Sequence, residues 1–132
     1  MMGKVIAVMI GGSIGSLLRY AASGMIQSRA ESIFPWGTMA VNLVGCFFIG
    51  FLWTVFENTT VRPETRVFFI TGILGGFTTF SAFGLETFNL VRDNEFLRAL
   101  ANFALTNGLG LVCVFAGVIV SRMLLHIFRG MI

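Results

Sequence analysis

Apolar residues dominate the chain in four long runs, and charged residues gather in the short stretches between them. The runs cover about residues 5–28, 35–56, 67–91 and 99–121. Each has about the 20 residues that an α-helix needs to cross about 30 Å of hydrocarbon. Little chain is left over, so the pattern predicts an all-α membrane protein, with one domain of four transmembrane helices over residues 1–132 and no soluble domain.

Composition supports a lipid environment and excludes several classes of function. Hydrophobic residues make up 56% of the chain and charged residues 11%, whereas soluble domains have about 25% charged residues. The net charge of +3 is modest and its arginines are scattered, so no nucleic-acid partner is predicted. No nucleophile–base pair is visible, which argues against an enzyme.

The distribution of positive charge predicts how the chain inserts into the membrane. Four spans place both termini on one side, and that side carries Lys4, Arg62, Arg66, Arg122 and Arg129. The other side carries Arg29, Arg92 and Arg98. The bias is weak for the positive-inside rule, and four helices enclose no protected path alone. Both features favour an antiparallel homodimer; a single orientation set by the small excess is the alternative.

The third apolar run is interrupted near its middle by the sequence GGFTTFSAF, residues 75–83. Its two glycines each weaken a helix by about 1 kcal/mol relative to alanine, and the hydroxyls of Thr78, Thr79 and Ser81 can bond freed backbone groups. Non-helical backbone at this depth persists only where it is buried in protein or lines water. We therefore predict a broken third helix. Its free carbonyls could hold a sodium ion, or the break is a glycine kink without a ligand.

Two phenylalanines follow the break directly. Phe80 and Phe83 are three residues apart and project from one face of a helix. The edge of an aromatic ring is positive, so it attracts an anion. The alternative is that both rings pack against lipid or core.

Polar residues elsewhere in the apolar runs each need a reason, and four of them are candidates for function. Asn42 is one helical turn after Thr38, and its amide either donates to a passing anion or forms an interhelical hydrogen bond. Arg19 either reaches the headgroups or marks the mouth of an aqueous vestibule. Glu86 comes late in its run and is interpreted as a vestibule residue or a hydrogen-bonding partner.

Together these residues resemble the small bacterial fluoride channels, the Fluc or CrcB family, over essentially the whole chain. The resemblance rests on an arginine-bearing first helix with a GGxxG run, an asparagine in the second helix, and above all GGFTTFSAF. It implies an antiparallel, dual-topology homodimer in the bacterial plasma (inner) membrane, with two fluoride pathways and a central structural sodium. The implied function is passive export of fluoride from the cytoplasm, and the implied partners are fluoride and the lipid bilayer.

The resemblance also implies roles for individual residues. Sodium would be held by the backbone carbonyls of Gly75 and Thr78. Fluoride would pass the pore residues Phe80, Phe83, Asn42, Ser81, Thr79 and Thr38. Arg19 and Glu86 would lie near the vestibule. The sequence departs from the family pattern at Ala82, where a threonine is common, so one pore-side hydroxyl is missing.

Two other classes of function remain as alternatives. A small dual-topology multidrug or cation exporter would need a central carboxylate in its first helix, but that helix carries Arg19 and no acid precedes Glu31. A membrane scaffold without transport activity leaves Asn42 and the polar break unexplained. The choice of fluoride over chloride comes from the resemblance, not from composition.

Overall fold

Four helices in the structure are long and apolar enough to cross a membrane, which confirms the predicted fold class. The computed structural model describes residues 1–130, with side chains for residues 1–127, and this part of the chain contains no strand. The spans are α1 (Met2–Ala30), α2 (Trp36–Asn58), a third span over Pro63–Arg92, and α6 (Phe96–Gly130). The homodimer stays a prediction.

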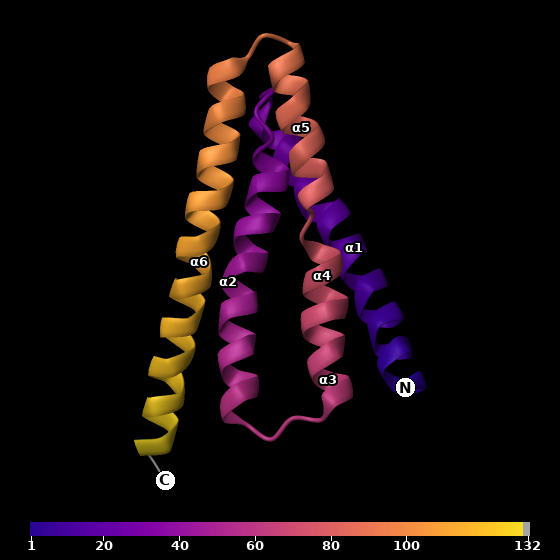
Figure 1. Cartoon of the computed structure of the whole chain (residues 1–132), viewed down its shortest axis with the longest axis vertical. Coiled ribbons are helices and arrows are strands. Elements are labelled where there is room, and N and C mark those ends of the chain that lie inside the picture. The colour runs from indigo at the N-terminus through magenta and orange to yellow at the C-terminus, as the bar shows by residue number, and fades with distance from the viewer. Residues whose placement is uncertain (131–132) are drawn as a thin grey trace.

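The spans run alternately up and down (Figure 1). Both termini and the connection between α2 and the third span lie at one end, as an even number of spans predicts. The spans converge at the other end, and α1 and α6 diverge toward the termini. Arg129 belongs to the basic residues assigned to the terminal end, but its side chain lies outside the described residues.

Two boundaries differ most from the prediction, because charged residues were taken to end the helices. The third span begins at Pro63 and not at residue 67. Pro63 suits the first helical turn because a backbone N–H at this position would have no intrahelical acceptor, so proline loses no hydrogen bond there. The helix α6 continues to Gly130, past the predicted end at residue 121. Arginine is a good helix former, so it can mark the membrane edge without ending the helix.

The third span is broken near its middle, as predicted. Its pieces are α3 (Pro63–Val67), the π-helix η1 (Phe68–Leu74), α4 (Gly75–Phe77) and α5 (Phe80–Arg92). The glycine at position 75 is still helical, with φ −63° and ψ −35°. The extended residues are Thr78 and Thr79, with ψ values of 157° and 122°. Threonine is β-branched and favours extended backbone, which places the break just after the glycines.

The helix α1 packs very closely against the first half of the third span. A Cβ atom on Gly11 would lie 2.6 Å from the carbonyl oxygen of Phe68. A Cβ on Gly15 would overlap the carbonyl oxygen of Ile73, and one on Gly76 would lie 2.6 Å from that of Gly12. Small residues permit such backbone approach between membrane helices. This contact fixes η1 and α4, and therefore the start of the break.

We expect Gly15→Ala to destabilise the fold and Gly12→Ala to leave it nearly unchanged. The first substitution forces α1 away from Ile73, at a cost of about 1–3 kcal/mol in unfolding free energy. At Gly12 an added Cβ meets nothing within 4 Å, so this variant is a matched control on the same helix. Thermal unfolding of both variants in detergent tests the expectation. Equal midpoints would contradict the close contact at Gly15.

The connection between α1 and α2 is held by the side chain of Gln27. Its Nε2 donates to the carbonyl oxygens of Ser32 (2.6 Å) and Phe34 (3.1 Å), and its Oε1 accepts from the N–H of Gly37 (3.1 Å). These bonds satisfy two carbonyls of the connection and one N–H in the first turn of α2. They fix the start of the helix that carries Thr38 and Asn42.

Candidate functional site

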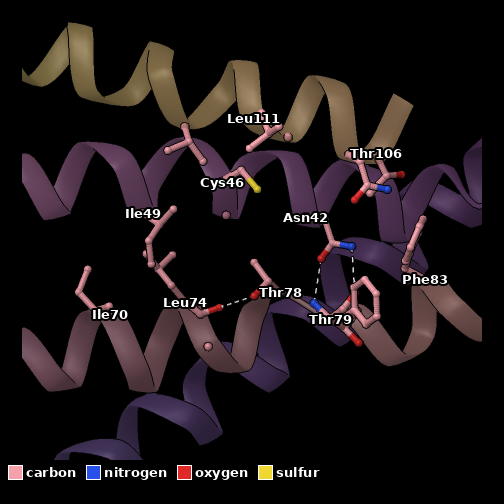
Figure 2. Close-up of a pocket in the computed structure, with 16 residues that line it drawn as sticks. Asn42, Cys46, Ile49, Ile70, Leu74, Thr78, Thr79, Phe83, Thr106 and Leu111 are labelled. Atoms are coloured by element: carbon pink, nitrogen blue, oxygen red, sulfur yellow. Dashed lines mark hydrogen bonds between the residues drawn. The ribbon is translucent and has the colours of Figure 1, made fainter. Parts of the chain in front are cut away.

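A groove of about 470 Å³ lies between α2, the third span and α6, directly beside the break (Figure 2). The predicted site residues that line it are Asn42, Gly75, Thr78, Thr79, Phe80 and Phe83. The helix α6 contributes Thr106 and Asn107 among others. No acidic side chain is among the described residues that line this groove.

Asn42 bridges α2 to the break through both polar atoms of its amide. Its Nδ2 donates to the carbonyl oxygen of Thr79 at 3.0 Å, and its Oδ1 accepts from the N–H of Thr79 at 2.8 Å. Figure 2 shows both bonds. The interhelical hydrogen bond considered from the sequence is therefore present. The amide keeps a second N–H, and its contact with fluoride stays a prediction.

Two backbone carbonyls at the break lack their helical partners. In a continuous helix the N–H of Thr79 would donate to the carbonyl of Gly75, four residues earlier, but it donates to Asn42. Similarly, the N–H of Ala82 donates to the Thr79 hydroxyl at 3.3 Å and not to the carbonyl of Thr78. These carbonyls belong to the two residues that the family resemblance implies as sodium ligands. Both residues line the groove.

Phe80 and Phe83 are neighbours, with ring centroids 5.5 Å apart and planes tilted by 46°. Their surroundings differ. Phe80 is 80% exposed, whereas Phe83 is 5% exposed and lies 6.4 Å from the ring of Phe103 on α6. The expectation that both rings follow one path is compatible with their proximity. Within a single chain, however, Phe83 is held by protein and Phe80 is free.

The remaining hydroxyls of the motif lie at the beginning of α5. The side chain of Thr79 caps this helix, and its hydroxyl lies 3.4 Å from that of Ser81, which is exposed. Ala82, which lies between Ser81 and Phe83 in the sequence, is half-buried. The two hydroxyls therefore form a polar patch next to the exposed ring of Phe80.

Thr38 and Glu86 lie together in a second cavity. The Thr38 hydroxyl donates to Glu86 Oε1 at 2.6 Å, and both residues line a space of about 360 Å³ with Ser23 and Gln27. The other carboxylate oxygen, Oε2, is buried without a hydrogen-bond partner among the described residues. The structure thus brings Thr38 to Glu86 and not into the groove that Asn42 lines.

Arg19 is the other residue predicted for the vestibule, and the ion pairs of the described residues do not join it to Glu86. It is half-buried, and its Nε is buried without a hydrogen-bond partner among the described residues. The ion pairs of the described residues do not include Arg19. Arg19 lies near the middle of α1, which runs from Met2 to Ala30, so this positive charge lies within the span.

Sequence reasoning missed Asn102, which is 1% exposed and hydrogen-bonded to Thr87 on α5. A signal was available, because an amide inside an apolar run is costly and needs a partner. Thr106 lies one turn later on the same helix, but the buried partner of Asn102 could not be inferred from spacing alone.

These features define a class: a four-helix membrane protein whose third helix breaks beside a groove lined by an amide, hydroxyls and aromatic rings. The family described as "CrcB-like protein, Camphor Resistance (CrcB)" matches residues 6–118. The chain belongs to this family.

Curated relatives extend the match over nearly the whole chain. A protein of Aquifex aeolicus is 46% identical over 93% of this chain and 100% of its own length. Proteins of Desulforapulum autotrophicum and Parabacteroides distasonis are 43% and 42% identical, over 92% and 96% of this chain and 98% of their own lengths. Each is named "Fluoride-specific ion channel FluC". These names describe ion channels and not enzymes, and with four spans the chain is a multi-pass bacterial membrane protein.

Proposed function

We propose that this protein is a fluoride-selective channel through which fluoride leaves the cytoplasm passively, down its gradient. The observation that carries the proposal is the groove at the break, where the Asn42 amide, the Thr79 hydroxyl and the Phe80 and Phe83 rings come together. The relatives named as fluoride-specific channels support the identity of the ion.

The chemistry of the groove suits a small anion that must shed water. A selective pore replaces the hydration shell of its ion with groups of the protein. The second N–H of Asn42 and the hydroxyls of Thr79 and Ser81 can donate hydrogen bonds. The ring edges of Phe80 and Phe83 add positive electrostatic potential. No acidic side chain is among the described residues that line this groove, so no carboxylate there would repel an anion or carry a proton along with it.

We further propose that two copies assemble as an antiparallel homodimer with two fluoride paths. In a single chain Phe80 and Gly75 are exposed, and irregular backbone does not face lipid within the hydrocarbon region. A second copy would cover the break. An antiparallel arrangement also agrees with the weak charge bias, and its two-fold symmetry produces two equivalent grooves.

A labelling experiment tests the antiparallel arrangement. A single cysteine at Thr60, between α2 and α3, should react with an impermeant maleimide in about half of the copies, because a weak charge bias permits both orientations. Cys46 and Cys113, the native cysteines, are first replaced by alanine so that only the new thiol reacts. Complete labelling from one side of the membrane would contradict the antiparallel dimer.

A structural sodium ion at the break completes the proposal. The carbonyls of Gly75 and Thr78 have lost their helical partners, and hard cations prefer oxygen ligands. Among the described residues no group of His, Cys, Asp or Glu side chains could hold a metal, so backbone oxygens are the ligands that fit. Between two antiparallel copies, the ion would neutralise carbonyl dipoles that face one another.

Sodium removal is expected to lower the thermal stability of the assembly. A ligand that binds only the folded state raises the unfolding midpoint as its concentration rises, so the midpoint should fall when sodium is replaced by N-methylglucamine. Returning sodium should restore it, and potassium at equal ionic strength is the control. A midpoint that is independent of sodium would argue against the site.

Efflux from liposomes tests the proposed function. Vesicles with the purified protein are loaded with potassium fluoride or potassium chloride, and valinomycin carries the counter-charge. We expect rapid fluoride release and retained chloride. Equal release of both anions would overturn fluoride selectivity. Fluoride release that requires a proton gradient would overturn passive conduction.

A further inference from the structure

A continuous chain of hydrogen bonds joins α5 to α6 at the level of Phe83. The Thr106 hydroxyl donates to Asn102 Oδ1 (3.2 Å), and Asn102 Nδ2 donates to the Thr87 hydroxyl oxygen (2.9 Å). The Thr87 hydroxyl then donates to the carbonyl oxygen of Phe83 (2.7 Å). The chain therefore runs from a residue on the groove wall to the backbone of the buried phenylalanine.

Asn102 is the centre of this chain and is almost completely buried, at 1% exposure. A buried amide in an apolar span is costly unless it is paired, and a satisfied polar network gives a rigid arrangement. Among the described side chains, the bond from Asn102 to Thr87 is the one hydrogen bond that links α5 with α6. The Asn102 amide therefore connects α6 to α5.

The position of α5 depends on such lateral contacts because the break separates it from α4. Thr78 and Thr79 are extended, so no continuous ladder of backbone hydrogen bonds orients α5 from the preceding helix. Thr87 lies one turn after Phe83, and Phe83 packs against Phe103, the residue that follows Asn102. Holding Thr87 against Asn102 therefore also fixes the ring of Phe83.

We infer that Asn102 is a positioning residue for the ion path: through Thr87 it sets the rotation of α5 and holds the Phe83 ring at the groove. This inference rests on the proposed conduction of fluoride. Asn102 itself does not line the groove, so it acts through Phe83 and not on the ion. A site held by its supporting residues loses performance when that support is removed.

Two substitutions remove the hydrogen bond between Thr87 and Asn102, and a third keeps it. Thr87→Val deletes the hydroxyl at nearly constant volume, and Asn102→Leu deletes the amide. We expect each to reduce fluoride efflux by about tenfold or more, the range expected when a buried hydrogen-bonding partner is lost. Thr87→Ser should retain efflux because it keeps the hydroxyl. The double variant should be no worse than the more severe single variant, since both break the same bond.

Thr54→Val is the matched control. Thr54 is also buried, and its hydroxyl donates to a carbonyl four residues earlier, Gly50, at 3.0 Å. It has no link to α6 through that hydroxyl, so its replacement should keep efflux near the level of the unmodified chain.

The inference fails if Thr87→Val conducts like the unmodified chain, or if Thr54→Val loses as much efflux as Thr87→Val. Should Asn102→Leu not fold, Thr87→Val decides the result alone. Absence of fluoride efflux from the unmodified chain would instead refute the proposed function, and that outcome is distinct from a failure confined to the variants.

Discussion

Replacement of Phe80 or Phe83 by isoleucine should largely abolish fluoride flux while the protein still folds. In the proposed path the positive edges of these rings face a dehydrated anion directly, and every 1.4 kcal/mol lost from such contacts corresponds to about a tenfold change. Phe80 is the cleaner position because its ring is 80% exposed in a single chain. Its replacement removes little packing within the chain, so a loss of flux while the dimer stays intact reports on the ring itself.

Phe56→Ile provides the control for these two variants. Phe56 is half-buried against Phe69, with ring centroids 6.2 Å apart, and it does not line the groove. A swap between apolar residues of similar size usually costs less than about 1.5 kcal/mol, so flux should persist. Efflux is measured in liposomes at equal protein content. Near-normal flux in both Phe80→Ile and Phe83→Ile would show that these rings serve packing and not conduction.

Asn42→Leu should destabilise the fold and stop conduction together. The variant leaves the N–H and carbonyl of Thr79 without the partners that hold them at 2.8 and 3.0 Å. Each unpaired backbone group in the hydrocarbon region costs several kcal/mol, so the break should rearrange or the assembly dissociate. The thermal unfolding midpoint and fluoride efflux are measured on the same preparation.

Asn107→Leu is the comparison for stability. The Asn107 amide donates to the carbonyl oxygen of Phe103 on its own helix, at 2.7 Å, and the side chain is exposed. Its loss leaves no interhelical contact broken, so the unfolding midpoint should change little. If Asn42→Leu were as stable as Asn107→Leu, the bridge from α2 to Thr79 would not be needed to hold the break.

Much of this architecture could be predicted because its signals are local. Twenty-residue apolar runs specify spans, and glycines followed by threonines specify a weak point in a helix. The break therefore falls close to its predicted place, at Thr78 and Thr79. The approach of Phe80 to Phe83 also follows from helical spacing.

The pairings between helices could not be predicted in the same way. A helix that is apolar on all sides carries no amphipathic signal for which face meets which neighbour. Helical spacing alone therefore placed Thr38 with Asn42 on one face of α2. In the structure, the Thr38 hydroxyl donates to Glu86 Oε1 on α5 at 2.6 Å. The link between Asn102 and Thr87 depends on the same crossing geometry. The π-helix η1 has no recognised sequence signal, although its close contact with α1 at Gly11 and Gly15 indicates tertiary packing as a contributor.

The central claim is that the groove conducts fluoride passively, without chloride and without coupling to protons. The reversal potential of single channels in planar bilayers tests this claim most directly. With unequal fluoride on the two sides, the account predicts currents that reverse at the Nernst potential of fluoride. This potential should not move when chloride is added to one side or when a pH gradient is imposed. A reversal potential that follows chloride or the proton gradient would contradict the account.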